Sequence, residues 1–280
     1  MMKQSRKTFL KVLGVGSLTA AINPIKASAG YLDQPQAENE LILGLASYTL
    51  RKFDLEETLE MVARLNLEYI AFKSMHMPMD STDEEIKAIV EKVKASGRKL
   101  YGAGVIYMKS EDEVDNAFRY AKAAGLKVII GVPNPDLLGR VEKRVKETDI
   151  RLAIHNHGPE DDTYPSPKSA FDKIANMDPR MGLCIDIGHT LRSGYDPAKV
   201  IKQYKDRVYD VHLKDINSSE PDGKTLEMGR GVMDIPSVIK ALRSINYKGV
   251  MAVEYEKDGD DPMPGLAESV GFARGVMKTV

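Results

Sequence analysis

The hydrophobic and polar positions of this 280-residue chain follow two alternating patterns from Leu41 onward. Short apolar runs predict strands that are buried on both faces, because such strands lose the alternation of apolar and polar residues. These runs occupy 41–47, 69–73, 99–106, 127–131, 151–155, 181–186, 207–212 and 249–255. Amphipathic stretches between them predict helices at 54–66, 82–97, 110–125, 136–147, 166–176, 196–206, 234–246 and 264–280. Eight strand–helix units without a long linker predict an α/β protein with a single domain, a (β/α)8 or TIM barrel.

The first 29 residues follow a different pattern. A basic stretch, MMKQSRKTFLK, precedes the apolar run VLGVGSLTAAI and the small residues Ala27-Ser28-Ala29. This order predicts a secretory signal peptide that is cleaved before Gly30. The stretch SRKTFLK resembles a twin-arginine export motif with Lys7 in place of the second arginine, so the twin-arginine and general secretory routes both stay open. The alternative is a fraying N-terminal helix of a cytosolic protein.

The predicted organisation is therefore a leader over 1–29, a flexible linker over 30–40 and the barrel over 41–280. The apolar run of the leader is too short to cross a bilayer core of about 30 Å, so we expect no membrane span in the mature protein. We expect an exported, periplasmic protein, with a homo-oligomer as one possible assembly.

Composition narrows the classes of partner. The chain has 40 Lys and Arg against 41 Asp and Glu, which leaves no basic surface of the kind that binds nucleic acid. Its one cysteine, Cys184, excludes an intrachain disulfide. With no Trp and six Phe, the core must be built from aliphatic residues and the 14 Met.

Acidic and imidazole side chains collect at the C-terminal ends of four consecutive predicted strands. Alternate residues of a barrel strand point inward, and the C-terminal ends of the strands form the mouth where TIM barrels bind their ligands. The inward sets are Ala153, His155 and His157; Cys184 and Asp186; Asp210, His212 and Lys214; and Ala252, Glu254 and Glu256. The strand ends therefore direct acids and imidazoles at one point.

These converging side chains predict a metal site. Charges in a barrel interior are costly unless they are paired or bound to metal. Imidazole nitrogens mixed with carboxylate oxygens suit Zn²⁺, Mn²⁺, Co²⁺ or Fe²⁺ better than Ca²⁺. We expect one divalent ion, held by His155, Asp186, His212 and Glu254. The alternative is a hydrogen-bonded network in which each histidine pairs with a carboxylate.

Several cationic residues are candidates for contact with a substrate. Lys73 ends the second predicted strand on its inward side, where a lowered pKa would suit an acid or base; the alternative is a pair with Glu256. His76 follows in the next loop. Arg192, Lys214 and Arg230 are candidates for binding substrate hydroxyl or phosphate groups.

The chain resembles the sugar phosphate isomerase/epimerase family in six stretches, by their order and by their placement at strand ends. These stretches are IHNHGPE, CIDIGHTLRSG, DVHLKD, GRGVMD, NYKG and AVEYE. These are the xylose isomerase-like TIM barrels, within the superfamily of AP endonuclease family 2. The resemblance spans the chain from GLASYTL to EYE. The family includes endonuclease IV, which binds three zinc ions. This chain has five histidines and lacks the Asp-Pro-His motif of that enzyme, which argues against a DNA substrate.

The resemblance implies a ligand set for the metal. In ketose 3-epimerases of the family, one divalent ion is held by Glu, Asp, His and Glu from four strands, and the two glutamates move the proton. The last three correspond here to Asp186, His212 and Glu254, with His189 beside the substrate. Where the family often has Glu-Asn-His, this chain has His155-Asn156-His157, so one of the two glutamate proton carriers is absent.

The expected function is that of an exported, metal-dependent isomerase or epimerase of a keto-sugar, working through an enediolate. Glu254 would remove the proton, and His189, His157 or Lys73 would return one or protonate a departing oxygen. One alternative is a lyase or dehydratase that acts on 3-keto-glycosides or related keto-sugars. A second is a non-catalytic carbohydrate-binding barrel, with Tyr48, Tyr107 and Tyr164 as its available stacking aromatics.

Overall fold

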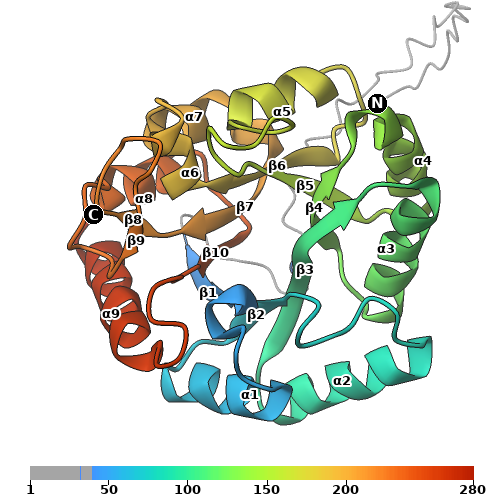
Figure 1. Cartoon of the computed structure of the whole chain (residues 1–280), viewed down its shortest axis with the longest axis horizontal. Helices are drawn as coiled ribbons and strands as arrows, with labels where there is room; N and C mark the ends of the chain where they lie inside the picture. The colour runs from blue at the N-terminus through green and yellow to red at the C-terminus, as the bar shows by residue number, and fades with distance from the viewer. Residues whose placement is uncertain (1–31, 33–39) are drawn as a thin grey trace, which may run out of the picture.

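The computed structural model describes residue 32 and residues 40–280, which form a closed barrel of eight parallel strands ringed by helices (Figure 1). The predicted TIM barrel is confirmed. The predicted signal peptide and most of the predicted linker lie outside the described residues. The barrel strands are β1 (Ile42–Ala46), β2 (Tyr69–Phe72), β3 (Lys99–Met108), β4 (Val128–Pro133), β5 (Arg151–His155), β6 (Met181–Asp186), β7 (Val208–Leu213) and β10 (Val250–Val253).

The strands follow the chain around the barrel, and β10 closes it by pairing with β1 and with β7. The helices around them are α1 (Leu55–Arg64), α2 (Asp83–Ala95), α3 (Glu111–Ala123), α4 (Leu138–Thr148), α5 (Pro167–Ile174), α6 (Ile187–Arg192), α7 (Pro197–Gln203), α8 (Ile235–Ser244) and α9 (Met263–Thr279). Short 3-10 turns are η1 (Ser47–Leu50), η2 (Pro135–Leu137) and η3 (Lys205–Arg207). The short α6 and a small antiparallel pair, β8 (Asp215–Ile216) and β9 (Thr225–Leu226), are additions to the predicted pattern.

Side-chain capping fixes where several helices begin. Asp54 and Thr82 each form a reciprocal capping box with the glutamate three residues on, at the start of α1 and α2. Asp186 caps α6 through its Oδ1, which accepts from the His189 amide at 2.9 Å. One carboxylate oxygen of Asp186 is thereby committed to the backbone, and its other oxygen faces the barrel interior.

Two apolar layers hold the barrel together. The larger lies between the strands and the helices, and the smaller fills the barrel interior. Among the interior residues are Ala71, Ala153, Cys184 and Ala252, which is the inward phase expected from the alternation of the strands. The interior is therefore packed mainly with apolar side chains, and His155, Asp186, His212 and Glu254 lie toward the C-terminal ends of the strands.

One irregularity of β7 sets the position of the polar groups. Leu183 pairs with Val208 but Cys184 pairs with Asp210, so β7 has one extra residue, Tyr209, opposite β6. Because of this bulge, Tyr209 packs in the barrel interior and Asp210 is also fully buried one residue later. His212 is then paired with Asp186 in the register of β6 and β7.

Among the described helices, none is both apolar enough and long enough to cross a bilayer.

Candidate metal centre and active site

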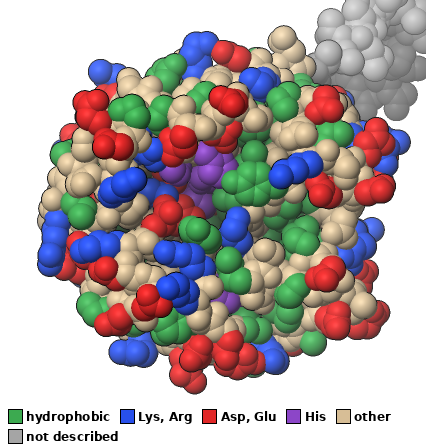
Figure 2. All heavy atoms as spheres, in the orientation of Figure 1, with side chains coloured by type: hydrophobic (Ala, Val, Ile, Leu, Met, Phe, Trp, Pro, Cys, Tyr) green, Lys and Arg blue, Asp and Glu red, His purple; other side chains and the backbone are tan. Residues whose placement is uncertain are grey.

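Four side chains meet at the C-terminal mouth of the barrel. They are His155 at the end of β5, Asp186 at the end of β6, His212 in β7 and Glu254 directly after β10. Each is at most 6% exposed, and one ligand atom from each lies within 4.8 Å of the others. The structure therefore brings together the four residues that the sequence predicts as metal ligands. Figure 2 shows histidine side chains gathered in a hollow at the centre of this face, with acidic and basic side chains beside them.

Three of the spacings between these atoms are close to the spacing expected between ligands of one metal ion. Zinc–ligand bonds of about 2.0–2.1 Å place neighbouring ligand atoms about 3.3 Å apart. His155 Nε2 lies 3.2 Å from His212 Nδ1, and His212 Nδ1 lies 3.1 Å from Glu254 Oε2. His155 Nε2 lies 3.6 Å from Asp186 Oδ2. Two imidazoles and two carboxylates arranged in this way suit a Zn²⁺, Mn²⁺, Co²⁺ or Fe²⁺ ion.

Lys214 supplies positive charge to the same cluster. Its Nζ lies 2.9 Å from Asp186 Oδ2 and 2.8 Å from Glu254 Oε2, and it also pairs with Glu256. The lysine is 3% exposed. Burial lowers its pKa, but the three carboxylates outweigh burial and hold that pKa well above its ordinary value. Lys214 is therefore an ammonium ion that shares two carboxylate oxygens with the candidate metal site.

The carboxylates of the cluster are ionised. Burial raises the pKa of Glu254, but His212 and Lys214 overcome it and hold that pKa well below its ordinary value. Burial also raises the pKa of Asp186, but the charge of Lys214 overcomes it and holds that pKa well below its ordinary value. Both residues therefore present anionic oxygens, the form that a divalent ion binds.

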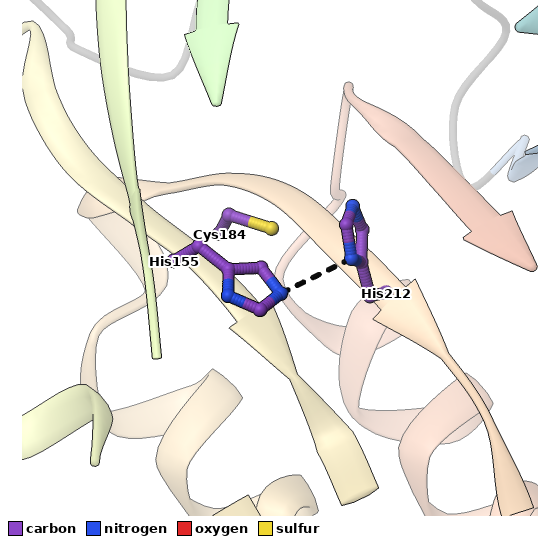
Figure 3. A group of neighbouring side chains, drawn as sticks. All are labelled: His155, Cys184 and His212. Carbon is purple, nitrogen blue, oxygen red and sulfur yellow. Dashed lines mark hydrogen bonds between the residues drawn. The ribbon is translucent and has the colours of Figure 1, made fainter. Parts of the chain in front are cut away.

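A second set of potential ligands lies deeper. His155, Cys184 and His212 also have ligand atoms within 4.8 Å of one another (Figure 3). Burial raises the pKa of the Cys184 thiol to about 12, whereas metals bind the thiolate. Cys184 Sγ instead lies 3.9 Å from Asp210 Oδ2, a buried carboxylate that also accepts from Tyr101. The set with two carboxylates is therefore the better candidate for the metal.

A pocket opens above the cluster. Its volume is about 350 Å³, in the lower part of the range for small-molecule sites. Its lining residues are Tyr48, Lys73, Val105, Tyr107, His155, His157, His189, Glu254 and Glu256. All four residues predicted as catalytic (Lys73, His157, His189 and Glu254) are among them. Tyr48 and Tyr107, two of the three tyrosines that the sequence offers as stacking aromatics, line the pocket, and Tyr164 does not.

Lys73 lies at the pocket wall between two aromatic rings. Its Nζ donates to the Val105 carbonyl at 2.9 Å and lies 5.7 Å from the Tyr48 ring centroid and 5.6 Å from that of Tyr107. Burial lowers the pKa of Lys73, with the charge of Glu254 opposing it. The alternative pair with Glu256 is not formed, because Lys214 is the partner of Glu256. The Lys73 amine is therefore available to a ligand in the pocket.

His189 is held in one tautomer by Arg192. Arg192 Nη1 lies 3.0 Å from His189 Nδ1, and a guanidinium group can only donate. Burial lowers the pKa of His189, so the ring is neutral and carries its proton on Nε2. Arg192 itself is fixed by Glu160 Oε1 at 2.6 Å and by the Pro221 carbonyl at 2.8 Å. His189 therefore offers an N–H donor from the side of the pocket nearest Asp186.

The other predicted substrate-binding residues lie elsewhere. His76 is buried beneath η1, within 2.9 Å of the hydroxyls of Thr58 and Ser47, and does not line the pocket. Arg230 pairs with Glu268 on α9 at the surface. Arg192 positions His189, and Lys214 neutralises the carboxylates below. The structure therefore shows packing or positioning contacts for these four residues, and their contact with a substrate stays a prediction.

Comparison with known proteins gives a family match and partial relatives. The model of the xylose isomerase-like TIM barrel family matches residues 59–276. An inosose dehydratase of Lacticaseibacillus casei is 27% identical over 138 residues, which cover 43% of this chain and 45% of that enzyme. An inosose dehydratase of Clostridium perfringens is 28% identical over 153 residues, 49% of each chain. The chain thus aligns with about half the length of these curated relatives.

Solved structures share the whole barrel. An uncharacterised protein of Parabacteroides distasonis is 25% identical, with a TM-score of 0.65 over 84% of this chain and 98% of that one. The IolI protein, solved with a bound zinc atom, has a TM-score of 0.72 at 16% identity over 85% of this chain and 99% of that one. An L-ribulose 3-epimerase has a TM-score of 0.69 at 14% identity, over 86% and 95% respectively.

Proposed function

Because the chain belongs to the xylose isomerase-like TIM barrel family, we propose that it is a divalent-metal-dependent isomerase or epimerase that acts on a keto-sugar. The observation that carries this proposal is the meeting of His155, Asp186, His212 and Glu254 beneath a pocket of about 350 Å³. When bound by these four residues, a divalent ion would polarise adjacent carbonyl and hydroxyl oxygens and make the neighbouring C–H group more acidic.

Glu254 is the proposed base for that C–H group. Its carboxylate lines the pocket and is ionised, while His212 and Lys214 hold it in place at 3.1 and 2.8 Å. A carboxylate fixed on one side of the sugar removes the proton from one face only. The negative charge left on the substrate is delocalised as an enediolate. Proton return on the other face gives an epimer, and return at the neighbouring carbon gives an isomer.

The remaining groups of the pocket face the substrate oxygens. His189 donates a hydrogen bond from Nε2, and the Lys73 amine can donate to an oxygen that develops negative charge. Tyr48 and Tyr107 offer aromatic faces to the apolar side of a sugar ring. His157 lies between Tyr107 and His155 and is the proposed route for proton return.

A metal-dependent lyase or dehydratase is the second candidate, and two observations favour it. Two of the partial relatives bear the name inosose dehydratase. In addition, His155 occupies a ligand position where a second glutamate would give the symmetrical pair of proton carriers. In this reaction Glu254 removes the same proton, and Lys73 or His189 protonates the oxygen that leaves from the β-carbon. The two reactions share every residue until that last step.

The test is incubation of the metal-loaded protein in D₂O with free ketoses, 3-keto-glucosides and an inosose, followed by NMR. We expect deuterium at the carbon next to the carbonyl, with either an epimer, an isomer or an eliminated product identifying the reaction. Glu254→Gln should lower the exchange rate by about 10²- to 10⁴-fold, the usual contribution of a positioned base. Binding of a sugar without exchange or product, with and without metal, would support the non-catalytic barrel and refute the proposal.

A further inference from the structure

His76 and Ser47 form a buried polar pair beside the pocket, although neither residue lines it. His76 is 3% exposed and lies in the turn after β2, and Ser47 is 1% exposed and begins η1. His76 Nδ1 lies 2.9 Å from Ser47 Oγ. Buried polar groups are costly unless they have hydrogen-bond partners, so the partners of this pair show what it holds in place.

The pair holds both backbone hydrogen-bonding groups of Lys73, the residue directly after β2. The Lys73 amide donates to Ser47 Oγ at 2.8 Å, and the Lys73 carbonyl accepts from the His76 amide at 3.0 Å. The paired register of β1 and β2 ends at Ala46 and Ala71, so Lys73 lies beyond that ladder. Its backbone position therefore depends on the contacts with Ser47 and His76.

The direction of the hydrogen bond within the pair follows from its other contacts. His76 Nε2 lies 3.2 Å from the Phe53 carbonyl, which can only accept, so this nitrogen carries the ring proton. Thr58 Oγ1, 2.9 Å from the same nitrogen, can also accept from it. Burial lowers the pKa of His76, so the ring is neutral and its Nδ1 accepts from the Ser47 hydroxyl. The Ser47 oxygen in turn accepts from the Lys73 amide.

The backbone held by this pair sets where the Lys73 side chain enters the pocket. The Lys73 Nζ donates to the Val105 carbonyl at 2.9 Å. The ring centroids of Tyr48 and Tyr107 lie 5.7 and 5.6 Å from the same nitrogen. Because Tyr48 directly follows Ser47, the pair also fixes the start of one of these two pocket residues. A long flexible side chain reaches a fixed point only when its backbone is fixed as well.

We propose that His76 and Ser47 are positioning residues of the active site, which place the Lys73 amine against a substrate oxygen by holding the Lys73 backbone. This inference rests on the proposed function, in which Lys73 donates to such an oxygen. Neither residue touches the substrate. Because a misplacement of about 1 Å can lower a rate by about 10²-fold, the pair should affect turnover although it lies outside the pocket lining.

Two substitutions of His76 separate the two sides of its ring. The polar end of asparagine lies about as far along the side chain as Nδ1, so His76→Asn can keep the contact with Ser47. The polar end of glutamine reaches as far as Nε2, so His76→Gln can keep the contact with Phe53 but not the one with Ser47. In the D₂O assay, product formation should fall about 10-fold or more in His76→Gln and stay within about threefold of wild type in His76→Asn. Ser47→Ala, which removes the hydroxyl, should resemble His76→Gln.

A spectroscopic arm follows the position of Lys73 without turnover. In the full chain labelled with lysine that carries ¹³C at Cε, the Lys73 signal is identified by its loss in Lys73→Met. Aromatic rings displace the proton signals of nearby groups, so the two tyrosine rings beside Lys73 should separate its signal from those of the other lysines. Ser47→Ala and His76→Gln should move this signal toward the other lysines, and His76→Asn should leave it in place.

Ser269→Ala is the matched control, because Ser269 is 1% exposed and its hydroxyl also accepts from a backbone amide, that of Met228 at 3.0 Å. It should change neither the Lys73 signal nor the rate. An unchanged Lys73 signal in folded Ser47→Ala and His76→Gln would overturn the inference, and so would a displaced signal with product formation at the wild-type rate. Equal losses in His76→Asn and His76→Gln would assign His76 a packing role. Absence of exchange and product in the wild-type protein would instead refute the proposed function, while the Lys73 signal would still test the positioning.

Discussion

At the scale of single residues, the centre is a balance of buried charges. Asp186 and Glu254 bring negative charge to a place where it is costly, and Lys214 neutralises part of it at 2.9 and 2.8 Å. Lys214 and a divalent ion would contact the same carboxylate oxygens, so the cluster can hold positive charge with or without metal. Because His155 stands where the family often has a glutamate, the ligand set carries one negative charge fewer than that pattern would give.

Lys73→Met separates the two candidate reactions at this scale. Methionine keeps much of the volume but cannot protonate a departing oxygen. If elimination is the reaction, exchange of the C–H proton should survive while product formation falls by about 10²-fold or more. If epimerisation is the reaction, Lys73 acts only as a donor to the oxygen that develops negative charge, so exchange and product formation should fall together. The measurement is the D₂O assay with each substrate class.

The matched control for Lys73→Met is Lys168→Met, which removes an exposed lysine paired with Asp172 on α5. A loss of product below threefold with an eliminating substrate corresponds to less than about 0.7 kcal/mol of barrier. That outcome would contradict a role for Lys73 as the acid.

At the scale of elements, the connection from β7 to α8 is organised by two carboxylates. Buried Asp215 accepts from four backbone amides, those of Ile216, Gly229, Gly231 and Met233, at 2.8–3.0 Å. Glu227 accepts from the hydroxyl of Tyr255 at 2.9 Å and from Lys257 at 2.8 Å. Because Tyr255 follows Glu254, this second carboxylate ties the loop to the segment that carries the proposed base.

The low pKa of Glu227 predicts that part of the free energy of unfolding is lost in acid. The hydrogen bond from Lys257 lowers the pKa of Glu227 to about 2, below the ordinary 4.5 expected in the unfolded chain. A depressed pKa stabilises the folded protein above pH 4.5, and this contribution is lost as the pH falls toward 2. Glu227→Gln should therefore lower the free energy of unfolding at pH 6 by about 1–2 kcal/mol and reduce its decline between pH 5 and 3.5.

Urea unfolding followed at several pH values measures this effect. Glu268→Gln is the control, since Glu268 forms a pair with Arg230 at the surface and should change the pH profile little. Parallel declines in the wild-type protein and in Glu227→Gln would show that Glu227 has no such depressed pKa.

At the scale of the whole molecule, the candidate metal site links four consecutive strands of the barrel. A ligand that binds only the folded protein stabilises it, by about 2.7 kcal/mol at a free concentration 100 times Kd. Zn²⁺ or Mn²⁺ added to protein stripped by a chelator should therefore raise the free energy of unfolding. Asp186→Asn, which removes one anionic ligand, should abolish most of this gain.

Urea unfolding with and without metal, together with elemental analysis of the purified protein, checks this prediction. Asp206→Asn, in the exposed turn η3, controls for the loss of one negative charge away from the site. An equal gain from metal in the wild-type protein and in Asp186→Asn would exclude Asp186 as a ligand.

The barrel and the phase of its strands are encoded in the sequence. Eight apolar runs separated by amphipathic helices admit few other arrangements, because each strand must be covered on both faces. The inward positions of His155, Asp186 and Glu254 follow from alternation along regular strands, so the sequence alone predicts these residues at the mouth. Helix ends agree within a few residues where Asp54 or Thr82 provides a cap.

Which charged side chains meet depends instead on the tertiary structure. Lys214 and Lys73 both occupy strand ends and both have long flexible side chains, so the sequence could not tell which of them pairs with Glu256. The structure gives Glu256 to Lys214 because their strands, β7 and β10, are neighbours, while Lys73 donates to Val105 across β2 and β3. The contact between Tyr107 and His157 also joins a residue of β3 to the loop after β5, and no local pattern encodes it. Periodicity fixes the direction in which a side chain leaves a strand, whereas a contact depends on the neighbours that the closed barrel supplies.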